Sequence, residues 1–230
     1  MSSSFKRSLI IPAAGSASRF RGLPKFLLPT QTNNVTLIER HLLYLRNYFD
    51  EVLIGINPDF SKNLNSILSE DEKIRIYQMS TKTMMETVIK LADESVNENF
   101  MLIMPDTFFS DYNEIEKYLK NESHNEPSLL CWDIKEFQIG KLGQVLINEL
   151  NQVVEIQDKN PLCTFRLFWG IAIFAKHHLQ EAFSSDPHIG FLFERLIKKN
   201  IAVKGYRIHG NYFDCGTQDE YIKMLLESKF

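Results

Sequence analysis

The sequence predicts an α/β protein with a mainly parallel sheet, helices on both of its faces and a smaller antiparallel lobe. Three observations predict this class. Short apolar segments alternate with amphipathic ones in the first half, and this alternation changes to consecutive strand-like segments after about residue 134. No linker, internal repeat or low-complexity segment interrupts the chain. We therefore expect one domain over residues 1–230, with halves at about 1–134 and 135–230.

The first half has the order expected of a parallel sheet. Its strands are predicted from short apolar runs that end at turn residues, at 8–13, 51–57, 73–79, 99–106 and 127–134. Its helices are predicted from apolar residues at helical spacing, at 35–49, 59–70, 83–96 and 111–122. The last of these segments carries acidic residues in its first turn, where the helix dipole favours them.

The second half has a different pattern, in which strands follow one another before helices return. It is expected to contain a hairpin at 143–158, a strand at 167–175, helices at 177–183 and 190–199, a strand-like segment at 201–217 and a closing helix at 218–230. Asn148 to Asn151 supply the turn residues of the hairpin. Thr217 is the expected N-cap of the closing helix.

Composition excludes several classes of protein. A net charge of −3 leaves no general basic surface for nucleic acid. No window approaches the roughly 20 apolar residues of a membrane span, and the N-terminal apolar run is interrupted by Pro12. Cys131, Cys163 and Cys215 are odd in number and far apart, which argues against a disulfide framework or a zinc site. We expect a cytoplasmic protein that binds neither nucleic acid nor membrane.

The loop after the first predicted strand combines small residues with cations. Its small residues are Ala13, Ala14, Gly15, Ser16 and Ala17. They would let backbone N–H groups approach an anion closely, and Arg19 and Lys25 would add positive charge for a polyphosphate. A Gly/Ala turn with solvated cations explains the same residues equally well. Neither the P-loop pattern nor the G-x-G-x-x-G fingerprint occurs in this loop.

Two aspartates follow predicted strands. Asp106 ends the apolar segment 99–106, and Asp214 follows the aromatic residues of 201–217. Because ligands of open α/β sheets bind beyond the carboxyl ends of the strands, both carboxylates are expected near the same edge. Two carboxylates that share substrate phosphates suit Mg²⁺. Each aspartate alone is explained at least as well as a helix cap or a turn residue.

Taken together, these motifs resemble those of the nucleotidyltransferases that activate sugar 1-phosphates, of the glucose-1-phosphate thymidylyl-, uridylyl- and cytidylyltransferase type. The resemblance covers nearly the whole chain. The matching segments, in order, are "GSASR" with "PK" at Pro24-Lys25, the strand that ends at Asp106, Gly143 in "KLGQV", "VVEIQDKNP", "WGIAIF" and "YFDCGT". The shared order and separations of these segments carry the resemblance.

The resemblance implies a Rossmann-like nucleotide-diphospho-sugar transferase fold, with a nucleotide-binding first half and an acceptor-binding second half. It implies Mg²⁺-dependent transfer of NMP from an NTP to a sugar 1-phosphate, with release of pyrophosphate. Arg19 and Lys25 would be catalytic, and Asp106 and Asp214 would hold Mg²⁺. The nucleotide-binding residues implied are Ala13, Ala14, Gly15, Ser16 and Gln78, and the acceptor-binding residues are Gly143, Asp158 and Lys159. The expected partners are an NTP and a phosphorylated small molecule, with a possible homo-oligomer and a role in polysaccharide biosynthesis.

Departures from the family pattern leave two alternatives. Ala17 replaces a loop glycine, Thr83 stands where a glycine is expected near the base, and Asn160 separates Lys159 from Pro161. The short gap from Arg19 to Lys25 is also found in cytidylyltransferases, so the acceptor could be a non-sugar phosphate such as phosphocholine or a polyol phosphate. A non-catalytic regulator that binds a nucleotide sugar is the other alternative. The joint presence of both aspartates and the cations argues against it.

Overall fold

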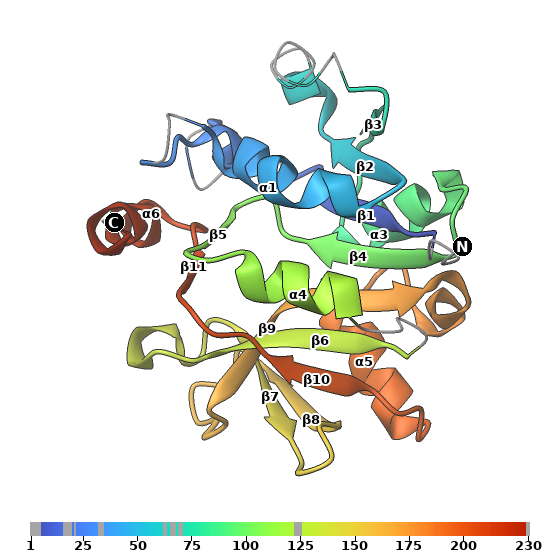
Figure 1. Ribbon diagram of the computed structural model, residues 1–230, viewed down its shortest axis with the longest axis vertical. Coiled ribbons are helices and arrows are strands. Elements are labelled where there is room, and N and C mark those ends of the chain that lie inside the picture. The colour runs from blue at the N-terminus through green and yellow to red at the C-terminus, as the bar shows by residue number, and fades with distance from the viewer. Residues whose placement is uncertain are drawn as a thin grey trace.

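The computed structural model describes residues 6–15, 20, 22–31, 35–61, 64, 68, 71–121 and 126–228. These residues form a mixed α/β structure around a nine-stranded sheet with the strand order β10-β6-β9-β4-β1-β2-β3, to which β7 and β8 are attached (Figure 1). The strands of this sheet are β1 (Ser8–Ala13), β2 (Glu51–Ile56), β3 (Ile74–Gln78), β4 (Asn99–Ile103), β6 (Ser128–Asp133), β7 (Gly143–Ile147), β8 (Val153–Asp158), β9 (Leu167–Ala175) and β10 (Lys204–Arg207).

The parallel part of the sheet is built on β1, which pairs with β2 and β4, while β2 pairs with β3. Successive side chains of a strand point to opposite faces, so β1 contributes to two cores. Leu9 and Ile11 lie in one hydrophobic cluster and Ile10 in another, all fully buried. Burial on both faces is the reason that this strand is continuously apolar.

Helices cover both faces of the sheet (Figure 1). Residues of α1 (Leu37–Leu45) and α4 (Asn113–Asn121) pack into the cluster of Leu9, and those of α3 (Met84–Glu94) and α5 (Gly190–Lys198) into the cluster of Ile10. The predicted α/β class with a mainly parallel sheet is confirmed. No helix among the described residues is long and apolar enough to cross a membrane.

The antiparallel region is continuous with the main sheet. The long strand β9 runs antiparallel to both β4 and β6, and it also pairs with β7. The hairpin predicted at 143–158 is present as β7 and β8, with Gly143 opposite Asp158. The antiparallel lobe is therefore this hairpin together with β9.

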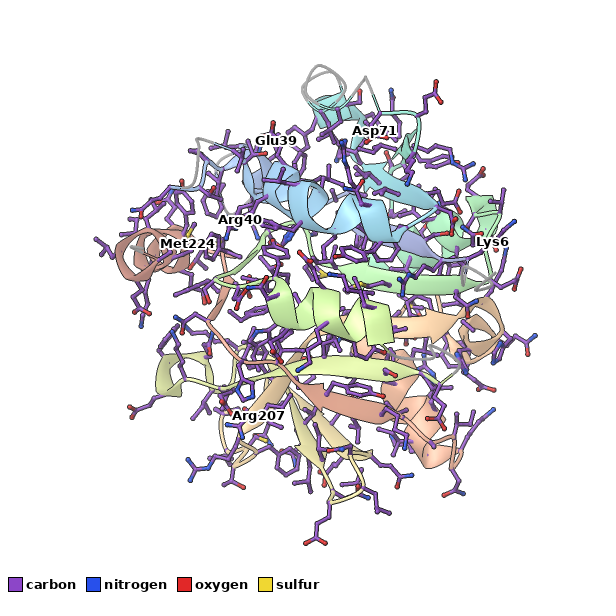
Figure 2. The ribbon with its side chains drawn as sticks, in the orientation of Figure 1. Lys6, Glu39, Arg40, Asp71, Arg207 and Met224 are labelled. Carbon is purple, nitrogen blue, oxygen red and sulfur yellow. The ribbon has the colours of Figure 1, made fainter. Side chains whose placement is uncertain are left out.

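A second, two-stranded sheet lies towards one side of the molecule, beside the closing helix (Figure 1). It joins β5 (Thr107–Phe109) to β11 (Tyr212–Asp214) in antiparallel register, with Asp214 opposite Thr107. The closing helix α6 (Gln218–Glu227) packs here through Met224, in a cluster that includes Phe108 and Phe213. Met224 lies at the same end of the molecule as Arg40 of α1 (Figure 2). Thr217 caps α6, accepting a hydrogen bond from the Glu220 N–H as the sequence predicts.

Three predicted elements differ in detail. The segment predicted as a helix at 177–183 is the 3-10 helix η6 (Lys176–Glu181). The segment 201–217 is split into β10 and β11, which belong to different sheets. The strand predicted at 99–106 ends at Ile103, and a turn leads to Asp106. Most of the helix predicted at 59–70 lies outside the described residues.

Candidate active site

A cleft with two connected parts lies beyond β1 and β4. The first part, here called the small-residue pocket, is lined mainly by Pro12, Ala13, Ala14, Gly15, Pro24, Phe26, Thr81, Lys82, Thr83, Thr87 and Pro105. The second part, here called the charged pocket, is lined mainly by Thr107, Lys141, Leu142, Gly143, Asp158, Lys159, Trp169, Pro187, His188, Tyr212, Asp214 and Gly216. Both parts share Lys25, Met84, Met104 and Asp106. These four residues form the junction of the cleft.

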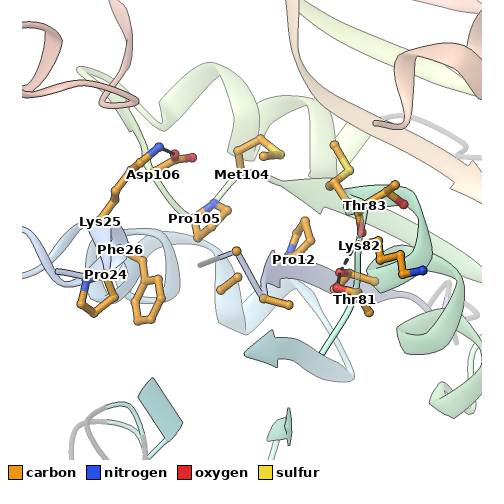
Figure 3. Close-up of a pocket in the computed structure, with 15 residues that line it drawn as sticks. Pro12, Pro24, Lys25, Phe26, Thr81, Lys82, Thr83, Met104, Pro105 and Asp106 are labelled. Carbon is orange, nitrogen blue, oxygen red and sulfur yellow. Dashed lines mark hydrogen bonds and ion pairs between the residues drawn. The ribbon is translucent and has the colours of Figure 1, made fainter. Parts of the chain in front are cut away.

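The floor of the small-residue pocket is the carboxyl end of β1 and the residues that follow it. Ala13 and Ala14 present only methyl groups, and a Cβ built on Gly15 would meet nothing within 4 Å. The backbone is therefore accessible to a flat or anionic group. Lys25 and Asp106 stand at one side of this pocket, and Thr81, Lys82 and Thr83 at the other (Figure 3).

The opposite wall is the start of α3. Thr83 is the N-cap of this helix, because its hydroxyl accepts a hydrogen bond from the Glu86 N–H at 3.0 Å. The Glu86 carboxylate in turn accepts one from the Lys82 N–H at 2.8 Å. The Thr81 and Thr87 hydroxyls are 2.6 Å apart and hydrogen-bonded. These contacts fix the wall before any ligand binds.

Lys25 and Asp106 form an ion pair at the junction. The Lys25 Nζ lies 3.1 Å from an Asp106 carboxylate oxygen, and the two side chains are only 18% and 19% exposed. Lys25 begins the short 3-10 helix η2 (Lys25–Leu27), which is anchored by the buried Phe26. Such a pair is more strongly coupled than one on an open surface, because less water screens it.

Asp214 reaches the same junction from the other end of the chain. The pairing of β5 with β11 places it beside Asp106, and the Cys215 N–H donates a 2.9 Å hydrogen bond to the Asp106 carbonyl. Burial, followed by the charges of Asp106 and Glu220, raises the pKa of Asp214 to about 7. Two carboxylates are thus held close together. The positive charge of Lys25 lowers the pKa of Asp214 but does not outweigh these effects.

This arrangement fits a divalent cation that is completed by substrate phosphates. Carboxylate oxygens are ligands that Mg²⁺ prefers, and Mg²⁺ is commonly held by one or two carboxylates plus phosphates. Burial and, after it, the charge of Asp106 raise the pKa of Asp214, and a cation between the two carboxylates would favour the ionised form of both. Within the described part of the chain, no group of three or more His, Cys, Asp or Glu side chains could hold a metal by itself.

The charged pocket takes its functional groups from β7, β8 and β9. Asp158 ends β8, and Lys159 follows it with a left-handed φ of 49°, an uncommon conformation for a lysine. Gly143 starts β7 opposite Asp158, and a Cβ on Gly143 would overlap the indole of Trp169. The glycine is therefore needed for Trp169 to pack, in addition to any role in binding.

His188 was not among the residues singled out from the sequence. Its Nε2 lies 3.0 Å from an Asp158 carboxylate oxygen, in the loop before α5. Burial alone would raise the pKa of Asp158, but the His188 side chain and the charge of Lys159 outweigh it, and the pKa lies below its usual value. No periodicity or strand boundary in the sequence marks His188, since only the fold brings the loop to Asp158.

The structure brings most of the predicted site residues to the cleft. Its lining includes Ala13, Ala14, Gly15, Lys25, Asp106, Gly143, Asp158, Lys159 and Asp214. Gln78 is exposed at the end of β3 and is not among the lining residues, whereas Thr81 to Met84 line the pocket near it in the chain. Ser16 and Arg19 lie outside the described residues. Their predicted roles stay predictions.

Comparison with protein families gives one match. The model of the MobA-like NTP transferase domain matches residues 9–160, about two thirds of the chain. This span includes both sides of the small-residue pocket, the junction residues Lys25, Met84, Met104 and Asp106, and Asp158 with Lys159. A search of curated protein sequences gave no match.

Solved structures with the same fold include several nucleotidyltransferases. A protein assigned as a glucose-1-phosphate thymidylyltransferase from Bacillus anthracis, in complex with sucrose, has a TM-score of 0.82 at 16% identity, covering 96% of this chain and 95% of its own. An inositol-1-phosphate CTP transferase from T. maritima has a TM-score of 0.75 at 16% identity, covering 98% and 97%. A UDP-glucose pyrophosphorylase complexed with UDP-glucose has a TM-score of 0.78 at 14% identity, covering 96% and 97%. At these identities the likeness shows a shared fold.

Proposed function

The chain belongs to the family of MobA-like NTP transferase domains and is a nucleotidyltransferase, and from this premise we propose that it transfers NMP from an NTP to a sugar 1-phosphate in a Mg²⁺-dependent reaction. The observation that carries this proposal is the junction of the cleft. Lys25 and Asp106 line both a pocket with an accessible backbone and a pocket with Asp158 and Lys159, and Asp214 lines the second pocket beside them. A nucleotide in the first and a phosphorylated acceptor in the second would meet at these three residues.

The reaction is an in-line displacement at the α-phosphorus. An oxygen of the acceptor phosphate forms a new bond to the α-phosphorus, and the bond to the β-phosphate bridging oxygen breaks. The electron pair leaves with pyrophosphate. Because the protein forms no covalent bond in this step, its task is to position the two substrates and to neutralise charge.

Each side chain has a proposed part in this task. Lys25 leaves its ion pair with Asp106 to contact the α-phosphate and the attacking phosphate. Lys159 binds the acceptor phosphate, and Asp158 and Gly143 contact the rest of the acceptor. Arg19, outside the described residues, is proposed to neutralise the departing pyrophosphate. Gln78 is retained only as a proposed contact to the base edge.

Asp106 and Asp214 are proposed to hold Mg²⁺. When bound, the ion supplies positive charge to the triphosphate and to the developing pyrophosphate. The two carboxylates supply the protein's share of its ligands. The cytoplasmic location and a role in polysaccharide biosynthesis belong to the same proposal. The free, buried state of all three cysteines agrees with a reducing compartment.

The deciding experiment measures pyrophosphate release with Mg²⁺ and each of CTP, UTP, dTTP, ATP and GTP. Each nucleotide is offered hexose 1-phosphates, inositol 1-phosphate and other polyol phosphates, and phosphocholine. Turnover with one nucleotide and a hexose 1-phosphate is the expected result. Asp106→Asn should abolish it, while Asp93→Asn, the same change at an exposed position on α3, should leave it unchanged.

Two results would contradict the proposal. Turnover that persists without a divalent cation would remove the assigned role of the two aspartates. Nucleotide binding without turnover for every acceptor in the panel would overturn the acceptor class. Thermal stabilisation by an NTP reports such binding independently of chemistry.

A polyol phosphate is the second candidate acceptor. The observation that favours it is the structural likeness to the inositol-1-phosphate CTP transferase, which extends over 98% of this chain and 97% of that one. The short gap from Arg19 to Lys25 in the sequence agrees with it. Release of pyrophosphate from CTP with inositol 1-phosphate, and with no hexose 1-phosphate, would select this candidate.

A further inference from the structure

The loop between η6 and α5, residues 182–189, is bonded to both pockets. The Ser184 carbonyl accepts a 2.6 Å hydrogen bond from the Thr83 hydroxyl, and the Pro187 carbonyl accepts a 3.3 Å hydrogen bond from the Met84 N–H. Both donors belong to the wall of the small-residue pocket. The next residue, His188, contacts Asp158 in the charged pocket. The loop therefore has a fixed place between the two parts of the cleft.

Asp186 anchors this loop to α5. Its side chain is buried, it accepts a 2.9 Å hydrogen bond from the Phe183 N–H, and it forms an ion pair with Arg195 of α5. A buried ion pair of this kind holds its segment in one geometry, because leaving either charge alone costs free energy. The backbone that carries His188 is thus positioned by contacts that do not involve the acceptor.

The His188 ring is hydrogen-bonded at Nδ1, whereas its Nε2 is buried without a hydrogen-bond partner among the described residues and faces Asp158 at 3.0 Å. Nδ1 accepts a 3.1 Å hydrogen bond from the Gly190 N–H, so a neutral ring carries its proton on Nε2, the atom that faces Asp158. A Cβ on Gly190 would come within 2.9 Å of the ring, so only glycine allows this approach. The ring centroid lies 5.0 Å from that of Phe191 and 6.0 Å from that of Trp169.

The two oxygens of Asp158 have different surroundings. Oδ2 lies 3.0 Å from the His188 Nε2, a close polar contact that does not complete a hydrogen bond among the described residues, and this contact does not involve Oδ1. The pKa of Asp158 lies below its usual value, so the carboxylate is ionised at neutral pH and accepts hydrogen bonds only. Its exposed fraction of 21% leaves it within reach of a ligand in the charged pocket.

We propose that His188 is a positioning residue for the acceptor: it holds Oδ2 of Asp158 so that Oδ1 accepts a hydrogen bond from a hydroxyl group of the acceptor. This inference rests on the proposed function, in which the charged pocket takes the phosphorylated acceptor. It narrows the substrate to a hydroxylated phosphate ester, such as a sugar or polyol phosphate. A phosphocholine headgroup has no O–H to donate to a directed carboxylate oxygen.

The test compares two substitutions at His188. His188→Leu removes the ring nitrogen that faces Asp158, whereas His188→Gln keeps an N–H group on a side chain of similar reach. His177→Gln, at an exposed position on η6, is the matched control. The probes are glucose 1-phosphate and inositol 1-phosphate, each with the nucleotide that supports turnover, and the readouts are the acceptor KM, kcat and the NTP dissociation constant.

We expect His188→Leu to raise the acceptor KM by at least about tenfold, on the scale of one hydrogen bond to a charged group, with little change in kcat. The NTP dissociation constant should stay unchanged, and His188→Gln should restore most of the acceptor KM. Equal effects of Leu and Gln, or a loss confined to kcat, would overturn the inference. If no acceptor turns over in the unmodified protein, the proposed function itself fails.

A measurement on the unmodified protein tests the inference even if the His188 variants do not fold. A series of monodeoxy glucose 1-phosphates should include one member whose KM is raised about tenfold or more. That penalty should be absent in Asp158→Asn. A series in which no hydroxyl matters, or in which the penalty persists in Asp158→Asn, contradicts the assignment.

Discussion

The two pockets of the cleft are lined by different kinds of chemical group. The small-residue pocket presents backbone, methyl groups and threonine hydroxyls that are already bonded to each other. The charged pocket presents ionised and aromatic side chains, including Asp158, Lys159 and Trp169. A backbone surface recognises features that all nucleotides share, whereas placed side chains recognise a particular ligand. If the proposed function is correct, we expect side chains of the second half to select the acceptor, and this selection to be changeable without altering the first half.

The junction belongs to both pockets, so changes there should have the largest effect. Lys25→Ala or Asp106→Ala is expected to cost about 3–4 kcal/mol of transition-state stabilisation, a loss of roughly a hundredfold to a thousandfold in turnover. Lys198→Ala, at an exposed position on α5, is the control. Steady-state pyrophosphate release measures the effect, and a fall below about tenfold in both variants would refute the assignment.

Changes confined to the charged pocket should separate acceptor binding from nucleotide binding. Lys159→Ala and Asp158→Asn are expected to raise the acceptor KM by about tenfold to a hundredfold, because each removes a charged hydrogen-bond partner. The dissociation constant for the NTP should be unaffected. If calorimetric titration shows equal losses of affinity for the acceptor and for the NTP, the two substrates do not bind in separate pockets as we infer.

Substitutions at two glycines, one in each pocket, test the same difference between the pockets. Gly15→Ala places its Cβ in open space, so the Tm should not change, while NTP binding weakens by about tenfold as the methyl group enters the small-residue pocket. Gly143→Ala forces a Cβ into Trp169, which should cost about 1–3 kcal/mol of stability and lower the Tm by several degrees. Differential scanning calorimetry with and without NTP distinguishes these results. An unchanged Tm for Gly143→Ala would show that Trp169 can move aside.

Among the described residues, each half has one buried histidine whose pKa is lowered, His41 and His178, and changes at these two should have the smallest effect. Burial and the charge of Arg40 lower the pKa of His41 to about 3, and burial and His177 lower that of His178 to about 4. The unfolded chain takes up a proton near pH 6.5, so below that pH it binds more protons than the folded protein. Stability therefore falls as the pH drops from 6.5 towards the folded pKa, by up to about 1.4 kcal/mol per pH unit for each histidine.

The variants His41→Asn and His178→Asn test this comparison. Each should lose some stability at neutral pH but show a shallower decline between pH 6.5 and 4.5, and the double variant should be shallower still. Urea unfolding at a series of pH values gives the slopes. A variant whose slope equals that of the unmodified protein would mean that its histidine is protonated in the folded state.

The sequence predicts the first half better than the second, for physical reasons. Strands such as β1 are buried on both faces, so an uninterrupted apolar run marks them. The junction residue Asp106 is predicted because it closes the apolar segment of β4, although the strand itself ends at Ile103. The segment 201–217 divides at Gly210-Asn211, two turn residues of which Gly210 has a left-handed φ of 103°. These residues indicate a turn but not that the two parts pair with strands of different sheets. His188 depends on a loop whose position is set by Thr83, Met84 and Arg195. Contacts between distant segments leave no local pattern.

The pairing of β5 with β11 also bears on how the protein is made. Asp106 emerges from the ribosome well before Asp214, and β11 follows every other strand of the structure in chain order. The parallel core around β1 can assemble from earlier segments, but the junction gains its second carboxylate only when β11 docks on β5. A nascent chain without β11 thus has only one of the two carboxylates of the proposed cation site. We therefore expect activity only after the last strand has been synthesised and has docked.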